Sequence, residues 1–254
     1  MESAGRSSSI PAMRPWVALL VLLALLVLLS TRATIAHARP THGAIEPIAA
    51  GVELDGREYD PVEVGRTGDY RDNVGTRYRR VVVRGTTVLG RGASAPLLET
   101  RTRELYAIEK DDTLRPVERT VLYADWPEGV ALVGLTETQE GKPPRVLGDP
   151  VVEMARKLRA DTTWKAGEAS ARVAGLADVT VAAGDYSRCV VIEEAGGYKL
   201  PDGKRTDVRR FYAPGVGEVF AAVLIGDAWR PAMELESMGA LPTYAVTEQP
   251  GPAK

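Results

Sequence analysis

From residue 67 to residue 240 the chain alternates short apolar or β-branched segments with turn residues. Residues 77–84 contain three consecutive valines and lie between Gly75 and Gly85. The turn Pro201-Asp202-Gly203 precedes another such segment, and there proline presets the first φ angle while glycine accepts a positive φ. The pattern predicts strands over residues 77–84, 103–108, 120–124, 130–135, 178–182, 186–193, 204–212, 217–225 and 232–238. Strands at roughly ten-residue spacing, with little helix, predict a mainly β protein with an antiparallel sheet, sandwich or open barrel.

Glycine and proline divide the rest of the chain. Residues 39–66 include Pro47 and Gly51 and show no periodicity, which predicts a linker. Residues 151–158 are the one short helix candidate, because their apolar side chains recur at helical spacing. The predicted organisation is an N-terminal segment 1–38, a linker 39–66, a single β-rich domain 67–240 and a disordered tail 241–254.

The N-terminal segment has the three parts of a signal peptide. Arg6 and Arg14 precede an unbroken apolar run over residues 16–29, and Ala36-His37-Ala38 follows it as an A-x-A exit. The alternative is an uncleaved apolar anchor helix. The run spans about 21 Å as a helix, which is short for a bilayer core about 30 Å thick, so cleavage is favoured. If this segment is not cleaved, the protein would contact the membrane through residues 16–29.

Both alternatives predict export. The domain would then be periplasmic, otherwise extracytoplasmic, or anchored to the membrane and facing outward. The formal net charge of −2 indicates a soluble, mixed surface and argues against nucleic acid as a partner, which would require a basic excess. The single cysteine excludes an internal disulfide.

The residues of most catalytic and metal sites are absent from the predicted domain. His37 belongs to the leader and His42 to the linker, so no held imidazole is available for a Ser-His-Asp or Cys-His site. Cys189 lies in an apolar strand, where a buried, inert thiol is the favoured interpretation. Asp111-Asp112 and Glu193-Glu194 do not have the spacing of a calcium loop. The sequence therefore predicts no metal, no cofactor and no catalytic residue.

Two further patterns have ordinary explanations. Gly90-Arg91-Gly92 imitates a dinucleotide fingerprint, but Pro96 excludes the helix that would face the phosphates, so a turn is predicted. Four arginines surround Tyr78, namely Arg77, Arg79, Arg80 and Arg84. They could contact phosphate or anionic lipid, but a solvated or edge-protecting strand face is favoured.

Three motifs between residues 158 and 223 carry a family resemblance. They are Ala-Asp-Thr-Thr-Trp164, Val-Thr-Val-Ala-Ala-Gly184-Asp-Tyr186 and Phe-Tyr212-Ala-Pro214-Gly215-Val-Gly217-Glu-Val. Their order resembles an uncharacterised family of exported bacterial β-domains, TapB-like or lipoprotein-like, related in fold to the LolA/LolB-type half-barrels. The chain departs from the family where the first motif lacks its glycine and has one extra residue, and where Ala182 replaces a proline.

The resemblance implies an antiparallel sheet curled into a half-open barrel, and it supplies no established activity. The motif residues have structural interpretations: Pro214-Gly215 as a tight corner, Tyr212 as an inward side chain and Trp164 as a cap on the core. No binding residue is indicated.

The leading functional hypothesis is a non-enzymatic cell-envelope domain that binds a hydrophobic ligand, such as a lipid, or an envelope protein. A cavity of several hundred Å³ open to solvent would favour ligand binding. The alternative is a surface domain that docks other envelope proteins through sheet edges, which a filled core and a long exposed edge strand would favour. The least favoured alternative is a hydrolase that uses carboxylates alone.

Overall fold

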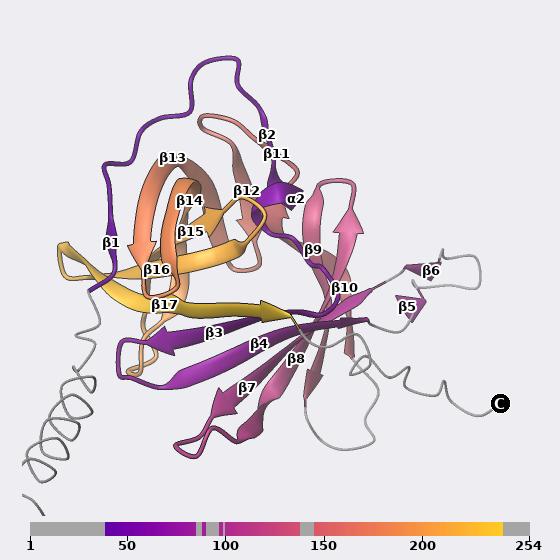
Figure 1. Cartoon of the computed structure of the whole chain (residues 1–254). Helices are drawn as coiled ribbons and strands as arrows, with labels where there is room; N and C mark the ends of the chain where they lie inside the picture. Colours follow the sequence, from indigo (N-terminus) through magenta and orange to yellow (C-terminus); the bar gives the residue numbers. More distant parts are fainter. Residues whose placement is uncertain (1–38, 85–87, 90–96, 99, 138–144, 241–254) are drawn as a thin grey trace, which may run out of the picture. The chain divides into compact units, whose positions relative to one another are not determined.

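The fold is described from a computed structural model that covers residues 39–84, 88–89, 97–98, 100–137 and 145–240 (Figure 1). The chain divides after Ala38, and Arg39–Lys254 form one unit. Within the described residues, a 13-stranded sheet with antiparallel pairing forms most of this unit. The strands follow the order β1 (Thr41–His42), β13 (Ala169–Val181), β14 (Gly184–Lys199), β15 (Arg205–Ala213), β16 (Gly217–Ile225), β17 (Ala228–Ala240), β3 (Arg66–Asp72), β4 (Arg77–Arg84), β7 (Arg101–Ile108), β8 (Leu114–Trp126), β9 (Gly129–Glu137) and β10 (Arg145–Ala155), with β12 (Thr163–Ala166) also on β13.

The remaining described elements are short. β2 (Leu54–Asp55) pairs with β11 (Lys157–Leu158), β5 (Val88–Leu89) pairs with β6 (Leu97–Leu98), and α2 covers Gly56–Tyr59. Figure 1 shows β13 to β16 curled tightly and β3, β4, β7 and β8 fanned out beside β17. The described strands do not close the sheet into a barrel, because β1 and β10 stand at the two ends of the strand order and do not pair with each other.

Alternation of side chains builds two apolar cores. Successive residues of a strand point to opposite faces of the sheet. On β14 and β15, Val190 and Tyr212 belong to the first core, which also contains Tyr123 of β8. Val191 and Phe211 belong to the second core. These central strands are therefore apolar on both faces, as expected for strands covered on both sides.

The prediction of a mainly β, antiparallel protein is confirmed. The predicted bounds of β4 and β16 are those of the structure. The strand predicted over residues 178–182 begins nine residues earlier, because β13 alternates buried and exposed positions from Ala169 onward. Its buried positions there include Ala171 and Val173 but no aromatic residue, so the hydrophobic signal is weak.

The prediction of a linker over residues 39–66 was wrong. The segment contains β1, β2 and α2, and it buries Ile48 and Tyr59, each 4% exposed. His42 packs its ring against Phe211 at 4.8 Å between centroids. Single apolar residues anchor this segment between glycines and prolines, so it has no periodicity to detect.

The helix predicted over residues 151–158 was also wrong. Val151 pairs with Leu132 and Ala155 with Gly129, so this part of the chain is the end of β10. Short apolar segments do not distinguish helix from strand by periodicity, and neighbouring valines favour a strand. The predictions for residues 1–38, Gly90-Arg91-Gly92 and residues 241–254 lie outside the described residues. Within the described part of the chain, no helix has the length and apolar character needed to cross a bilayer.

Candidate functional site

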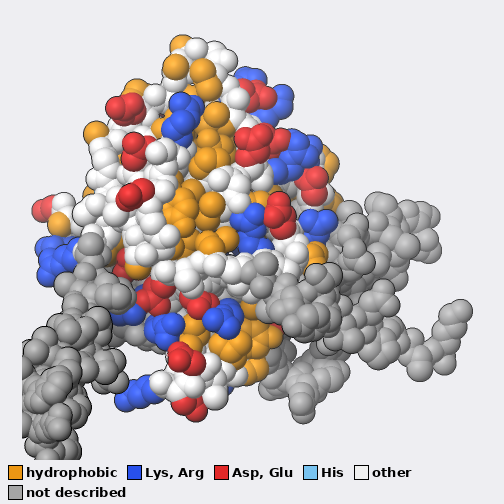
Figure 2. All heavy atoms as spheres, in the orientation of Figure 1, with side chains coloured by type: hydrophobic (Ala, Val, Ile, Leu, Met, Phe, Trp, Pro, Cys, Tyr) orange, Lys and Arg blue, Asp and Glu red, His pale blue; other side chains and the backbone are white. Residues whose placement is uncertain are grey.

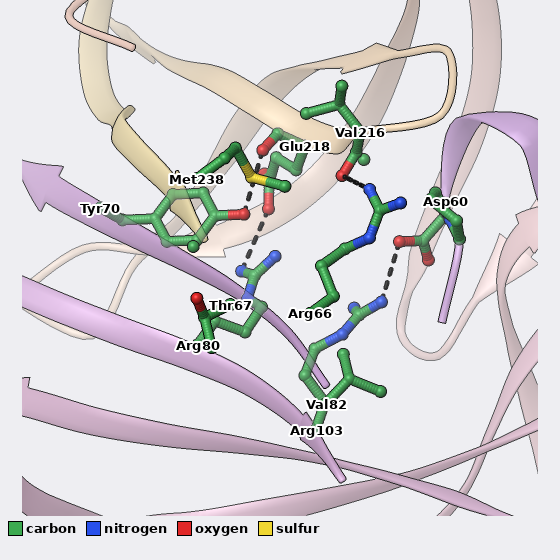
Figure 3. Close-up of a pocket in the computed structure, with 13 residues that line it drawn as sticks. Asp60, Arg66, Thr67, Tyr70, Arg80, Val82, Arg103, Val216, Glu218 and Met238 are labelled. Carbon is green, nitrogen blue, oxygen red and sulfur yellow. Dashed lines mark hydrogen bonds and ion pairs between the residues drawn. The ribbon is translucent and has the colours of Figure 1, made fainter. Parts of the chain in front are cut away.

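A network of buried charges lies on the face of the sheet that carries the first core. Glu218 of β16, 4% exposed, accepts a hydrogen bond from Arg210 Nη1 at 2.7 Å and one from Arg80 Nη2 at 3.3 Å. Arg210 Nε also donates to Glu194 Oε1 at 3.0 Å. Asp60, which follows α2, accepts from Arg103 Nη2 at 2.9 Å through Oδ1. Figure 3 shows the part of the network around Arg80, Arg103 and Asp60.

Strand register brings these residues together. On β14 and β15, Ile192 pairs with Arg210, so the guanidinium of Arg210 lies on the same face as the first core. Arg103 pairs with Val82 on β4, two residues from Arg80, so both arginines point to one side. Charged residues at inward positions thus converge from five strands without any local sequence motif.

Aromatic rings pack against these arginines. The Arg80 guanidinium lies 4.6 Å from the Tyr70 ring centroid, and that of Arg103 lies 4.3 Å from the Tyr123 ring centroid. Tyr70 donates its hydroxyl to the Glu218 carbonyl oxygen at 3.2 Å. Burial would raise the pKa of Glu218, but the adjacent Arg210 and Arg80 outweigh burial and lower it. Glu218 is therefore held as a carboxylate.

A small cavity lies within this network. Its volume is about 30 Å³, and Arg66, Arg80 and Arg103 line it together with Asp60 and Glu218. Arg66 donates to the carbonyl oxygens of Gly215 and Val216. A cavity of this size holds a water molecule and excludes an organic ligand.

Asp60 also lines a much larger cleft. Its volume is about 520 Å³. It is lined by Arg57, Asp60, Pro61, Val62 and Glu63 from α2 and the segment after it, by Arg101 of β7, by Tyr123, Ala124 and Asp125 of β8, and by Val130 of β9. We call this space the cleft. Asp60 and Pro61 line both the cleft and the small cavity, so the two spaces adjoin at these residues.

The charged groups at the rim of the cleft are already paired. Arg57 Nε donates to Asp55 Oδ1 at 3.0 Å, and Asp125 Oδ1 accepts from Arg156 Nη2 at 2.5 Å. Glu63 accepts from Arg66 at 2.7 Å. Arg101 Nη1 donates to the Val62 carbonyl oxygen at 2.8 Å.

Two carboxylates near the cleft are less completely bonded. Asp60 is 5% exposed, and its Oδ2 atom accepts no hydrogen bond from the described residues. Glu153 of β10 has no hydrogen-bond partner in the described part of the chain. Burial raises the pKa of Glu153, while Arg210 opposes the increase. Glu153 interacts electrostatically with Asp60 and Arg103, and also with Tyr123.

The motif residues of the sequence lie in separate parts of the sheet. Trp164 of β12 donates Nε1–H to the Val152 carbonyl oxygen of β10 at 3.1 Å, so its indole joins two strands that do not pair. Gly184 has φ 137° at the start of β14, and Tyr186 packs against the second core. None of these three residues lines the cleft.

The third motif lies closer to the charge network. Tyr212 is buried in the first core. Pro214 and Gly215 are exposed in the turn between β15 and β16, where Gly215 has φ 71° and donates its N–H to the Glu58 carbonyl oxygen at 2.6 Å. Gly217 lines the small cavity. The turn therefore supports the α2 segment, which forms one wall of the cleft.

The arginines around Tyr78 are divided between surface and interior. Arg77 pairs with Glu236 and Asp112, and Arg79 pairs with Asp69 through two hydrogen bonds of 2.7 and 2.9 Å. Arg80 points into the charge network, and the side chain of Arg84 lies outside the described residues. On the face that Figure 2 shows, Lys and Arg are interspersed with Asp and Glu.

Sequence reasoning missed Asp60, Arg103, Arg210 and Glu218. One usable signal was Glu218, a single acidic residue in the apolar strand Gly217–Ile225. The described residues contain no cluster of His, Cys, Asp and Glu suited to a metal ion. Comparison with protein-family models, with curated proteins and with solved structures gives no match. The resemblance to exported β-domains therefore stays a prediction.

Proposed function

We propose that this protein is a non-enzymatic, exported cell-envelope domain that binds a small amphipathic ligand in the cleft. In this proposal the curled sheet acts as a half-open barrel, and the cleft is its opening. The observation that carries the proposal is the cleft volume of about 520 Å³. It falls within the range of about 300–1,000 Å³ that small-molecule sites occupy.

The lining of the cleft supports an amphipathic occupant. Tyr123 and Val130 contribute buried apolar surface, and Pro61 and Val62 face them from the segment after α2. Arg57, Glu63 and Asp125 at the cleft are already in ion pairs, so a ligand does not have to neutralise them. Apolar surface with a few fixed polar groups is typical of ligand sites.

The burial and ion pairing of the reactive side chains support binding rather than catalysis. Cys189 is completely buried, and burial raises the pKa of its thiol to about 12, which leaves little thiolate for attack. Glu218 is tied to two arginines. A carboxylate-only hydrolase therefore remains the least favoured alternative.

Docking of an envelope protein through a sheet edge has less support. The outer edge of β13 is covered by β1 and β12, with a bridge from Glu46 to Leu176 between them. β10 is irregular between Val146 and Val151, where its register with β9 shifts and the chain contains Gly148-Asp149-Pro150. Proline cannot donate to a ladder, and irregular edges oppose strand addition.

The experiment is extraction of the protein purified from its native envelope, followed by mass spectrometry of the extract. We expect a stoichiometric small amphipathic molecule with the wild type. Val62→Trp places a large ring in the cleft and should remove that molecule. Val74→Trp is the control, because Val74 is 81% exposed and outside the cleft. An extract without bound molecule, or one that Val62→Trp leaves unchanged, would contradict the proposal.

A further inference from the structure

We infer that the small cavity among Arg66, Arg80 and Arg103 binds a single monatomic anion of the size of chloride. This site goes beyond the proposed function, because it lies inside the charge network and not in the cleft. The inference is carried by a buried donor that lacks a partner, by the guanidinium groups around the cavity and by the size of the cavity.

The buried side-chain atoms that lack a hydrogen-bond partner are donors. Among the described residues these atoms are Arg103 Nε and Arg156 Nε, and no buried side-chain oxygen is left without a partner. Arg103 lines the small cavity, whereas Arg156 does not. Buried polar atoms normally have partners, so Arg103 Nε–H requires an acceptor that the described side chains and backbone do not supply. We place that acceptor in the cavity.

Guanidinium groups surround the cavity. Figure 3 shows those of Arg66, Arg80 and Arg103 gathered beside Glu218 and Asp60. Within the described part of the chain, Arg80 donates to Glu218 and Arg103 donates to Asp60, each through Nη2. A guanidinium carries more N–H groups than either arginine uses in these bonds. Both arginines therefore retain donors for a further acceptor.

Arg80 and Arg103 are also close enough to repel each other. Burial and the charge of Arg103 lower the pKa of Arg80, although Tyr70 and Glu218 raise it overall. Glu218 is already fully used, because Oε1 accepts from Arg210 and Oε2 accepts from Arg80. An anion beside the guanidinium groups reduces their repulsion and accepts charge-assisted hydrogen bonds, which are stronger than neutral ones.

Water is the alternative occupant of the cavity. A water molecule accepts from Arg103 Nε–H but brings its own O–H donors to a place where no buried acceptor lacks a partner. An anion brings acceptor capacity alone, so donors rather than net charge define the site. The volume of about 30 Å³ suits chloride, which is little larger than water, and excludes sulfate, phosphate and organic anions.

The direct test is chlorine NMR of the purified protein in sodium chloride, because exchange with a bound ion broadens the line of the free ion. We expect saturable broadening that bromide displaces and gluconate does not, since gluconate is too large for the cavity. A line width without a saturable contribution from the protein would show that the cavity holds water only, and would overturn the inference.

Thermal unfolding gives a second readout. An anion that binds only the folded state stabilises it. Relative to gluconate at equal ionic strength, chloride should raise the melting temperature by about 2–4 °C at roughly five times its dissociation constant. Equal melting temperatures in the two salts at every concentration would count against the site.

Variants locate the ion. Arg103→Lys keeps a positive charge beside Asp60 but removes Nε–H, so it should weaken chloride binding about tenfold or more, with folding checked by circular dichroism. Arg115→Lys is the matched control, because Arg115 is 68% exposed and lies outside the cavity. Wild-type affinity for chloride in Arg103→Lys would overturn the inference. If Arg103→Lys does not fold, the wild-type line widths and melting temperatures still decide.

Val62→Trp separates this site from the cleft. Val62 lines the cleft but not the small cavity, so Val62→Trp should leave chloride binding unchanged. Loss of chloride binding in Val62→Trp would place the ion in the cleft and overturn the inference. If chloride does not bind while Val62→Trp removes an extractable molecule, the anion site is wrong and the proposed function stands.

Discussion

Replacement of Glu218 by glutamine should be among the most destabilising single changes in this protein. Glu218 accepts hydrogen bonds from both Arg80 and Arg210, and its side chain is 4% exposed. Glutamine has nearly the same shape, so the change leaves packing intact and removes only the negative charge. Arg210 would keep its ion pair with Glu194. Arg80 would lose the ion pair with Glu218, its one carboxylate partner among the described residues.

The expected magnitude follows from the cost of stranding a buried cation. Breaking a buried ion pair by removing one partner costs about 3–5 kcal/mol. For a domain of this size each kcal/mol lowers the melting temperature by about 2–4 °C, so Glu218→Gln should lower it by about 6–20 °C. Glu63→Gln is the matched control, because the Glu63 side chain is exposed and its pair with Arg66 should contribute about 1 kcal/mol or less.

Thermal and urea unfolding at neutral pH measure both variants against the wild type. If Glu218→Gln lowers the melting temperature no more than Glu63→Gln does, the buried network does not contribute the expected stability. A pH series adds a second check. The pKa of Glu218 is lowered in the fold, so its stabilisation is complete above the ordinary value of 4.5 and is lost as the pH falls through the folded value. The difference between wild type and Glu218→Gln should therefore shrink below that pH.

Three further changes test other parts of the structure. Burial raises the pKa of Glu153, and this increase outweighs the opposing effect of Arg210, so its ionised form opposes folding. Glu153→Gln should raise the melting temperature at neutral pH, with a gain that shrinks once the pH falls below the raised pKa and is gone below the ordinary value of 4.5; a loss of stability at pH 7 would contradict this assignment. Gly215→Val should cost roughly 1–2 kcal/mol, because φ is 71° there although a Cβ would meet no atom within 4 Å, and an unshifted melting curve would count against it. Cys189 should resist iodoacetamide in the native protein and react in urea, and fast native alkylation would show that the thiol is accessible.

The strands were largely predictable from sequence because each depends on local chemistry. Residues 77–84 and 217–225 combine β-branched or apolar segments with flanking glycines, and the structure has strands with those bounds. The segment before residue 66 was not predictable in this way. Ile48 and Tyr59 each occupy a hydrophobic core as single residues, which produces no periodic pattern.

The candidate site was not predictable, because it is assembled by long-range register. Asp60 and Arg103 are hydrogen-bonded although they lie 43 residues apart in the sequence, and Arg80 and Glu218 are hydrogen-bonded although they lie 138 residues apart. Apart from Glu218, which stands in an apolar strand, each residue alone resembles an ordinary surface charge. Only the pairing of β4 with β7, and the curl that brings β16 toward them, places these charges together.

The central claim, that the cleft beside Tyr123 is a ligand site, is tested most directly by titration with N-phenyl-1-naphthylamine. This neutral fluorophore brightens in apolar surroundings. The account predicts saturable binding to one site on the wild type, the same binding to Val74→Trp, and binding to Val62→Trp weakened about tenfold or more. Equal titration curves for wild type and Val62→Trp, or no saturable binding to the wild type, would contradict it.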